Sequence, residues 1–358
     1  MRDIKIFADD RFVEYSAKEQ INIILEQPAF ADAKIRIMPD VHAGAGCVIG
    51  FTADLGDKVI PNIVGVDIGC GMLVAKTTQK IDLPSFDSIV HQSVPSGFSL
   101  NKFKYKEPEL IISMLRCKGY LNKIDRLLYS LGTLGGGNHF VELDSGDDGD
   151  IYLVIHTGSR NLGLQVAMCY QKLAEEKCED DVPKDLKYLT GKDRDDYLHD
   201  MKLCQRFARI NRSKILSQIN QKIGEPIFSF EFESVHNYID DNNMVRKGAI
   251  SAHKGEKLII PMNMRDGCII GIGKGNEDWN ESAPHGAGRI LSRKEAREKL
   301  DLDEFRGAMQ GVYSTTLTER TIDEAPMAYK PKEVILSQVG DTVDIEKIIK
   351  PIYNYKGE

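Results

Sequence analysis

Residues 34–77 read KIRIMPDVHAGAGCVIGFTADLGDKVIPNIVGVDIGCGMLVAKT, and this stretch decides the fold. It is rich in β-branched residues and in glycine, so it predicts short strands joined by tight turns. The same texture returns in LGTLGGGNHFVEL (131–143), in YLVIHTGSRNLG (152–163) and from Phe228 to about Gly288. These separated strand-forming blocks predict one large core instead of two independent domains.

Helical patterns interrupt the strands. Residues 164–225 are rich in Lys, Glu, Gln, Leu and Met and poor in glycine, which predicts a helical insertion with a polar loop near 187–194. The stretch from Ser292 to Arg306 is also predicted to be helical, with Ser292 as its N-cap and Glu295 completing a capping box. The predicted fold class is therefore α+β: a single mixed α/β core of glycine-rich strands and turns over residues 1–358, with the helical insertion at 164–225.

Composition narrows the function classes. The net charge of −7 argues weakly against nucleic-acid binding, although the stretch from Lys202 to Lys222 carries six basic residues and no acidic ones. Arg206, Arg209 and Arg212 recur at i, i+3 spacing and could share one face of a helix. That face, extended to Lys214, would be either an RNA-binding surface or an ordinary solvent-exposed surface. No apolar run is long enough for a membrane span, and the polar start MRDIKIFADDRF predicts no signal peptide, so we expect a cytoplasmic protein.

Cysteine spacing excludes two kinds of site. The seven cysteines are odd in number and form no CxxC pair, so neither a disulfide framework nor a cysteine-only zinc site is expected. Most of these thiols are expected to be buried and inert.

Glycines crowd around a few polar residues, which is the pattern of a binding site approached closely by the backbone. Five such clusters hold His42, Asp67 with Cys70, His139, His156 and His285. Imidazole and thiolate suit Mn, Fe, Co or Zn better than Mg or Ca, and a thiolate can bridge two ions. The core is therefore expected to surround a buried transition-metal site.

Nucleotide motifs are weak on their own. GIGKGN (271–276) lacks the ending and spacing of a Walker A loop, and no dinucleotide fingerprint opens a helix. The KxDG lysine motif of classical nucleotidyl-transferring ligases is absent. A covalent nucleotide intermediate would therefore need a nucleophile other than that lysine.

Nine motifs, in order from about residue 37 to the last residues, carry a specific resemblance. They are MPDVHAGAGCVIG, NIVGVDIGCGM, LGTLGGGNHFVEL, HTGSRNLG, the HN of VHNY, RKGAISAHKGE, PHGAGRILSR, EAPMAYK and the terminal YKG. This series resembles the RtcB family of RNA-splicing ligases, which join RNA 3′-phosphate or 2′,3′-cyclic phosphate ends to 5′-hydroxyl ends.

The resemblance implies roles for individual residues. It implies a site for two Mn²⁺ ions bridged by Cys70, whose ligands match Asp67, Cys70, His139, His156 and His236. It implies that His285 takes GMP from GTP and passes it to the RNA 3′-phosphate, giving an RNA–ppG end. The residues that it places around the nucleotide are Asn138, Glu142, Asn263, Gly286, Gly288, Arg289, Tyr329 and Lys356, with Asn138 and Arg160 near phosphate or the metal.

This chain also departs from the usual family form. It is shorter, and IPMNMRDG (260–267) replaces a serine-containing loop, so Asn263 stands near the nucleotide phosphates. The stretch SAPHGAGR (282–289) also departs from the usual family form, in the residues just before His285. These features resemble a shorter subgroup linked with a release-factor-like protein and RNA repair.

Two other functions remain open from the residues alone. A dinuclear metal phosphoesterase would use the same ligands without His285 as nucleophile, and an RNA-end-binding protein would lack turnover. Among the other histidines, His42 and His253 are expected to be structural or to neighbour the ligands, and His91 and His199 to lie at the surface.

Overall fold

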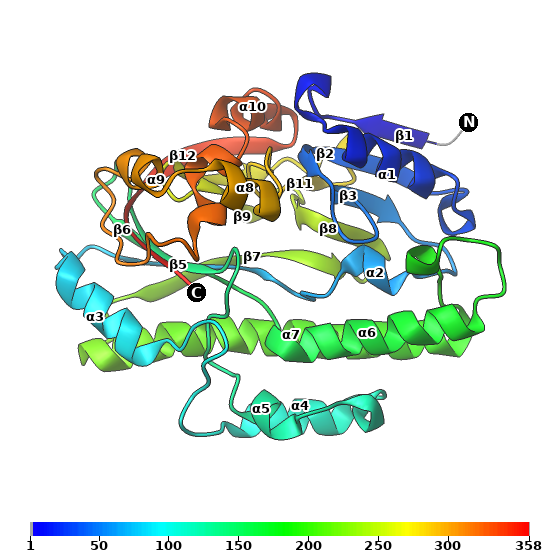
Figure 1. Ribbon diagram of the computed structural model, residues 1–358, viewed down its shortest axis with the longest axis horizontal. Coiled ribbons are helices and arrows are strands. Elements are labelled where there is room, and N and C mark those ends of the chain that lie inside the picture. Colours follow the sequence, from blue (N-terminus) through cyan, green and yellow to red (C-terminus); the bar gives the residue numbers. More distant parts are fainter. Residues whose placement is uncertain (1–2, 358) are drawn as a thin grey trace.

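The computed structural model describes residues 3–357 and has a long curled sheet with helices packed against it (Figure 1). Its strands are β1 (Asp3–Ile6), β2 (Lys34–His42), β3 (Ile49–Asp54), β4 (Gly71–Thr77), β5 (Phe140–Ser145), β6 (Ile151–Thr157), β7 (Ser229–Ile239), β8 (Met244–Ser251), β9 (Lys257–Asn263), β10 (Gly267–Gly273), β11 (Ser282–Pro284) and β12 (Val343–Lys356). Its α-helices are α1 (Tyr15–Leu25), α2 (Pro61–Val64), α3 (Leu83–Ser93), α4 (Lys106–Met114), α5 (Ile124–Leu128), α6 (Arg160–Lys177), α7 (Gly191–Ile223), α8 (Arg293–Lys299), α9 (Leu302–Ala308) and α10 (Lys332–Leu336).

The strand order places β4 in the middle of the sheet. That order is β1-β2-β3-β8-β7-β4-β6-β5-β12-β10-β9, with β11 paired to β8. Every pairing is antiparallel except β1 with β2. Met72 of β4 lies opposite His156 of β6 on one side and Ser234 of β7 on the other. Two histidine-bearing strands therefore flank the strand that follows Cys70.

The far edge of the sheet curls back onto its middle. The Ile259 N–H of β9 donates to the Ser234 hydroxyl of β7 at 3.1 Å. A buried apolar cluster fills the space inside the curl, with side chains from β4 to β7 meeting side chains from β9, β10 and β12. This curvature brings the C-terminal half of the chain over the ends of β4, β6 and β7.

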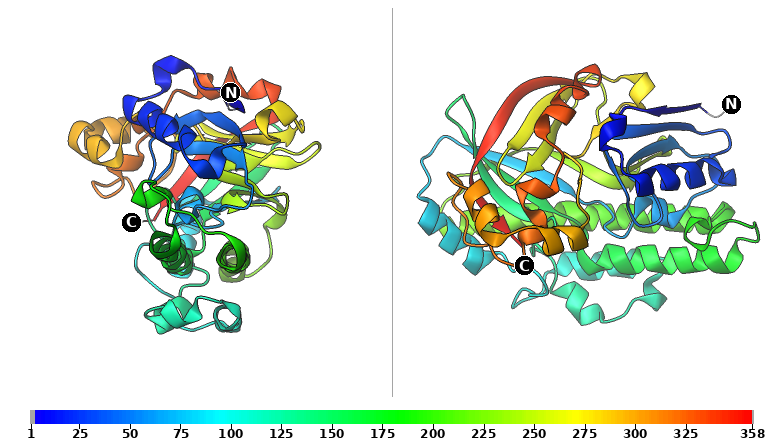
Figure 2. Two further views of the ribbon diagram at one scale, coloured as in Figure 1. Left: turned by 90° about the vertical axis from the view of Figure 1, so that its right-hand side faces the viewer. Right: turned by 45° about the horizontal axis from the view of Figure 1, so that its top comes forward.

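Helix α7 covers the other face of the sheet. Its Ile215 and Ile219 pack against Leu73 and Leu153, so α7 seals the outer face of β4 and β6. Figure 2 shows α6 and α7 side by side below the sheet, with the short helices α4 and α5 in a further layer beyond them.

Helices α6 and α7 occupy the stretch predicted as a helical insertion, with different boundaries. Helix α6 already begins at Arg160, and α7 begins at Gly191, inside the predicted polar loop. At the second predicted helix, the capping box of Ser292 and Glu295 is confirmed. That helix ends at Lys299, and Asp301 caps a new helix by accepting from the backbone N–H groups of Asp303 and Glu304.

The arginines of α7 do not form the shared basic face that their spacing suggested. Arg206 and Arg209 are exposed, but Arg212 is only 1% exposed and turns inward. Its guanidinium donates to the Gly69 carbonyl at 3.0 Å and to the Thr157 carbonyl at 2.9 Å. Arg212 therefore holds backbone beside the predicted metal ligands and is not available to a partner.

The predicted α+β class, with one large sheet, associated helices and buried side chains that could hold a metal, is confirmed. Within residues 3–357, no helix combines the length and the apolar character that a membrane crossing needs.

Candidate active site

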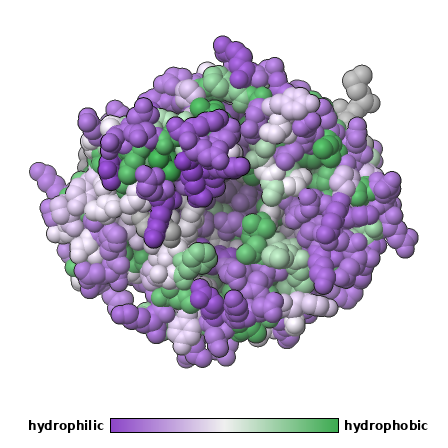
Figure 3. Space-filling view, viewed as in Figure 1, coloured by the Kyte–Doolittle hydropathy of each residue, from purple (hydrophilic) through white to green (hydrophobic). Residues whose placement is uncertain are grey.

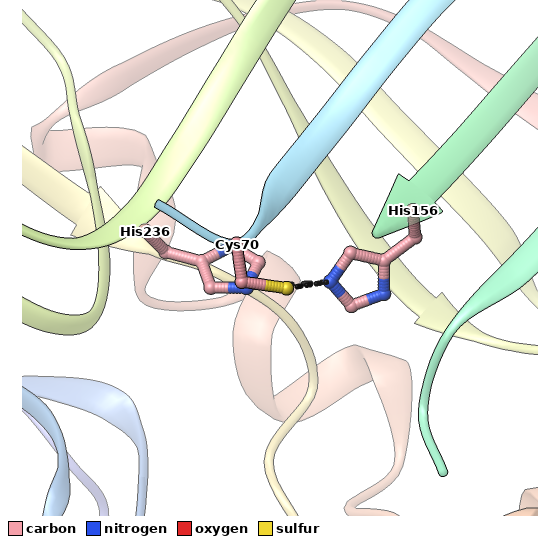
Figure 4. Close-up of side chains that lie close together, drawn as sticks. All are labelled: Cys70, His156 and His236. Carbon is pink, nitrogen blue, oxygen red and sulfur yellow. Dashed lines mark hydrogen bonds between the residues drawn. The ribbon is translucent and has the colours of Figure 1, made fainter. Parts of the chain in front are cut away.

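Three predicted ligands converge where β4, β6 and β7 meet (Figure 4). Cys70 ends the turn before β4, His156 is near the end of β6 and His236 lies on β7. The Cys70 Sγ is 3.2 Å from His156 Nε2, which is 3.3 Å from His236 Nε2. A backbone hydrogen bond of 2.8 Å from His236 N–H to the Cys70 carbonyl locks the two strands in this register.

A second group of ligands shares the same sulfur. The His139 Nε2 lies 3.4 Å from Cys70 Sγ and 2.9 Å from Asp67 Oδ2. Asp67, Cys70 and His139 thus form one triad of possible ligand atoms, and Cys70, His156 and His236 form another. Two triads that meet at one thiol are the arrangement expected of a pair of metal ions with a shared sulfur ligand.

The backbone around the triads is fitted to them. A Cβ on Gly158 would lie 2.1 Å from Asp67 Oδ1, so only glycine lets the carboxylate approach there. The His156 Nδ1 lies 3.1 Å from the Asn138 carbonyl, which fixes the ring and turns Nε2 toward the cluster. Asn237 adopts a left-handed backbone (φ 77°) next to His236.

The electrostatics suit a bound transition-metal cation. Burial lowers the pKa of His156 and of His236 well below the ordinary value, so both imidazoles are neutral and able to act as ligands. Burial raises the pKa of Asp67, but His139 outweighs it and brings that pKa down to about 2. Burial and the charge of Asp67 raise the pKa of the Cys70 thiol, so a thiolate there needs a cation. Sulfur, imidazole and carboxylate together fit a transition metal better than Mg²⁺ or Ca²⁺.

His285 stands next to this cluster with one nitrogen committed. Its Nδ1 lies 2.6 Å from Asp40 Oδ2, which also accepts from the His285 backbone N–H at 3.1 Å. Buried Lys330 donates to the Pro39 and Val41 carbonyls at 3.1 and 2.7 Å and so fixes the strand on both sides of Asp40. A carboxylate that holds the Nδ1–H leaves Nε2 with a free lone pair, as a nucleophilic imidazole requires.

One cavity of about 590 Å³ joins the two triads of possible metal ligands to the predicted nucleotide site. The side chains of His236 and His285 meet in it, with ring centroids 4.8 Å apart. The predicted site residues that line it are Asp67, Cys70, Asn138, Glu142, His156, His236, Asn263, His285, Gly286, Gly288, Arg289, Tyr329 and Lys356. His139 is buried beside Asp67. Figure 3, viewed as in Figure 1, shows a hollow near the middle of the molecular surface, beside the position of α8 in Figure 1.

Glu324 organises one wall of the cavity. This buried carboxylate accepts from the Tyr329 hydroxyl at 2.7 Å and from Lys356 Nζ at 2.9 Å, and it is 2.5 Å from Arg293. Burial raises its pKa, but the charges of Lys356, Arg293 and Arg289 outweigh burial and hold the pKa below the ordinary value. The Arg289 guanidinium also lies 5.0 Å from the centre of the Tyr329 ring. Tyr329 and Lys356 are therefore held in place through one shared anion.

Glu142 lines the cavity and is almost fully buried. It accepts from the Asn354 amide at 2.5 Å, and burial raises its pKa to about 7. Asp144 and Cys268 lie beside it, and burial and Glu142 raise the pKa of Asp144 well above its ordinary value. Glu142, Asp144 and Cys268 form a third group of possible metal ligands, in which the raised pKa of Asp144 favours its protonated form.

Sequence reasoning did not assign Asp40 or Glu324 a role. Both stand inside motifs that carry the resemblance, in MPDVHAGAG and EAPMAYK, so a signal was present. Asn263 lines the cavity, but its side chain closes the turn after β9 by accepting from the Arg265 and Asp266 backbone N–H groups at 3.0 Å.

The remaining histidines lie outside the metal cluster. His42 lines the cavity with Nδ1 2.9 Å from the Asp40 carbonyl, and burial lowers its pKa to about 4. His253 pairs with Glu281 at 3.0 Å at the β8–β9 turn. His91 and His199 have side chains that are 46% and 40% exposed, each near a carboxylate.

The fold and the cavity define a class: a mixed α/β protein with paired metal-ligand triads beside a histidine that has a free ring nitrogen. The sequence profile of the family described as "tRNA-splicing ligase RtcB" matches residues 21–119 and 113–357. The chain therefore belongs to the RtcB family of RNA ligases.

Named relatives agree with this assignment over nearly the whole chain. The chain is 30% identical to the RNA-splicing ligase RtcB of Escherichia coli K12, across 99% of this chain and 97% of that protein. It is 28% identical to the tRNA-splicing ligase RtcB of Nanoarchaeum equitans, across 99% and 95%. It is 26% identical to the RNA-splicing ligase RtcB2 of another Escherichia coli strain, across 92% and 89%.

Proposed function

We propose that this chain is a GTP- and Mn²⁺-dependent ligase that joins an RNA 3′-phosphate or 2′,3′-cyclic phosphate end to a 5′-hydroxyl end. The observation that carries the proposal is the shared cavity. Two ligand triads meet at Cys70 in it, and His285 points into it beside His236.

Asp67, Cys70, His139, His156 and His236 are proposed to hold two Mn²⁺ ions, with Cys70 as the common ligand. Bound cations would neutralise phosphate charge and orient the phosphoryl groups. The donor set supports this proposal because thiolate and imidazole favour Mn²⁺, Fe²⁺, Co²⁺ or Zn²⁺ over Mg²⁺.

His285 is proposed as the nucleophile. Its Nε2 attacks the α-phosphorus of GTP, the nitrogen–phosphorus bond forms and pyrophosphate leaves with the broken bond's electrons. Asp40 keeps the Nδ1–H and stabilises the positive charge that develops on the ring, at a contact of 2.6 Å.

The RNA then takes the GMP. An oxygen of the RNA 3′-phosphate attacks the same phosphorus, the bond to His285 breaks, and an RNA–ppG end forms. The 5′-hydroxyl of the second RNA attacks the 3′-phosphorus, GMP departs, and the hydroxyl proton goes to water. A cyclic phosphate end is first opened by water.

The guanine base is proposed to bind beside Glu142 and Lys356, which both line the cavity. An ionised Glu142 can accept from guanine N1–H and the 2-amino group, and Lys356 can donate to O6. Tyr329 and Arg289 form the adjoining wall, with Gly286 and Gly288 following the nucleophile. Asn263 is proposed to lie near the phosphates, and Asn138 and Arg160 near phosphate or the metal.

RNA repair is the proposed task, with a release-factor-like protein as functional partner. Ribonuclease breaks leave the cyclic phosphate and 5′-hydroxyl ends that this chemistry consumes. The departure at 260–267 from the usual serine loop supports membership in the subgroup linked with that partner.

The test is covalent labelling with α-labelled GTP and Mn²⁺, followed by denaturing electrophoresis. His285→Ala should abolish the label, whereas His253→Ala should keep it, because His253 pairs with Glu281 outside the cavity. Label that persists in His285→Ala would contradict the nucleophile. A wild-type protein that never labels but hydrolyses phosphoesters would be a metal phosphoesterase, and one that only binds RNA would be an end-binding protein.

A second assay tests the polarity of joining. Two matched RNA pairs are incubated with GTP and Mn²⁺, one with 3′-phosphate and 5′-hydroxyl ends, the other with 3′-hydroxyl and 5′-phosphate ends. Only the first pair should be joined, and joining of the second alone would refute the proposal.

A further inference from the structure

An exposed strip of aromatic and basic side chains connects α3 to α4. We define the 98–106 strip as FSLNKFKYK; in it Phe98 is 94% exposed and Phe103 56% exposed. Lys102, Lys104 and Lys106 are exposed as well. In Figure 1 this segment passes below the C-terminus and leads into the outer layer of α4 and α5.

The strip begins beside the metal cluster. The Gly97 N–H donates to the Gly135 carbonyl at 2.8 Å, and Arg160 donates to the Gly97 carbonyl at 3.2 Å. Gly135 lies four residues before His139, so the two Cα atoms are at most about 15 Å apart. Arg160 is half-buried; burial lowers the pKa of its guanidinium, and the nearby charge of Asp67 opposes that shift. Phe98 therefore follows directly on backbone that is hydrogen-bonded to the segment leading to His139 and to Arg160.

The charge of the strip is opposite to that of the whole chain. Residues 88–106 contain no Asp or Glu, whereas the chain carries a net charge of −7. Within residues 3–357, Lys102, Lys104 and Lys106 have no carboxylate within ion-pair distance. Lys214 shows the contrast, because it pairs with Glu107 at 3.1 Å and lies 4.6 Å from the centre of the Tyr105 ring.

We propose that the 98–106 strip binds a single-stranded segment of the RNA substrate next to the end that is joined. Bases stack on Phe98 and Phe103, and Lys102, Lys104 and Lys106 neutralise the phosphates between them. Aromatic faces interleaved with cations are the combination that holds single-stranded nucleic acid without reading its sequence. The proposal depends on the proposed function, because that function makes RNA the substrate. It places the RNA-binding surface on the 98–106 strip and not on α7, where Arg212 is buried.

Fluorescence anisotropy of a labelled single-stranded RNA of about 12 nucleotides with a 3′-phosphate tests the proposal on the Mn²⁺-loaded protein, without GTP. Phe98→Ala and Phe103→Ala should each weaken binding at least about fivefold, since one lost stack costs about 1 kcal/mol or more. Phe98→Trp should retain affinity because indole stacks equally well. The control Phe230→Ala, at an exposed ring on β7, should leave affinity unchanged.

Salt dependence tests the lysines. Neutralising two phosphate contacts in Lys102→Gln/Lys104→Gln should make the slope of log K against log salt shallower by about 1.4. Lys254→Gln, at the exposed β8–β9 turn, should leave the slope unchanged.

Affinities within twofold of wild type for both alanine variants would overturn the proposal. The binding assay contains no GTP and needs no catalytic turnover, so its result does not depend on whether the ligase mechanism is correct. Wild-type protein that never labels with GMP, while the strip variants lose RNA, would sink the ligase mechanism and leave the strip standing. Melting curves matching wild type exclude misfolding as the cause.

Discussion

Replacement of Asp40 by Asn isolates the charge behind the nucleophile. Asp40 is fully buried, and its Oδ2 accepts from both Nδ1 and the backbone N–H of His285. Asn is nearly isosteric, so it can keep both contacts while it loses the negative charge. Guanylylation turns the His285 ring into a cation, and the pair is then worth about 4 kcal/mol for charge centres about 4 Å apart at an effective dielectric of about 20.

Part of that energy survives as a neutral hydrogen bond, which leaves a loss of about 2–4 kcal/mol. We therefore expect Asp40→Asn to slow single-turnover guanylylation about 30- to 1000-fold, measured as labelled protein against time after rapid mixing with α-labelled GTP and Mn²⁺. Asp148→Asn, at the exposed β5–β6 turn, is the matched control. A rate for Asp40→Asn within threefold of wild type, with metal content unchanged, would refute the role of Asp40.

Further variants test the metal, the backbone support and the base pocket. Cys70→Ala should lose most of the bound manganese, measured by mass spectrometry after desalting, because both triads use that sulfur; full metal content would remove Cys70 from the site. Arg212→Met should lower the free energy of unfolding by about 3 kcal/mol in a denaturant titration, because Glu233 and two carbonyls lose their buried partner; a loss under 1 kcal/mol would contradict that support. Because burial raises the pKa of Glu142 to about 7, its ionised form grows as pH rises, so GTP should bind about tenfold more tightly at pH 8 than at pH 6. Calorimetry checks this, and Glu142→Gln should flatten the profile; an equal pH dependence in that variant would assign it to another group.

Local sequence already carried the class of the fold. β-branched and glycine-rich blocks predicted strands and turns because the conformational preferences of these residues act over a few positions. The capping box of Ser292 and Glu295 was predictable for the same reason, since it spans only four residues. The restart of the helix after Asp301 was missed because Ser292–Arg306 keeps its helical composition across the break. The basic spacing in α7 misled for another reason: three arginines at i, i+3 share a side of a helix, but packing decides whether that side faces water.

By itself, the sequence determined which thiol, imidazoles and carboxylates the chain offers, and it showed that most of them stand among glycines that let backbone approach closely. Residue spacing alone could not place Asp67, Cys70, His139, His156 and His236 together, because His156 lies 86 residues after Cys70 and His236 a further 80 residues after His156. Only the sheet order, with β4 between β7 and β6 and with β5 beyond β6, brings the ligand atoms within each triad to within 4.8 Å of one another. The tertiary structure likewise brings Asp40 into contact with His285, which lies 245 residues later in the sequence. Spacing in a sequence constrains neighbours on one element, whereas a site built across strands depends on register and curvature, which the whole core sets.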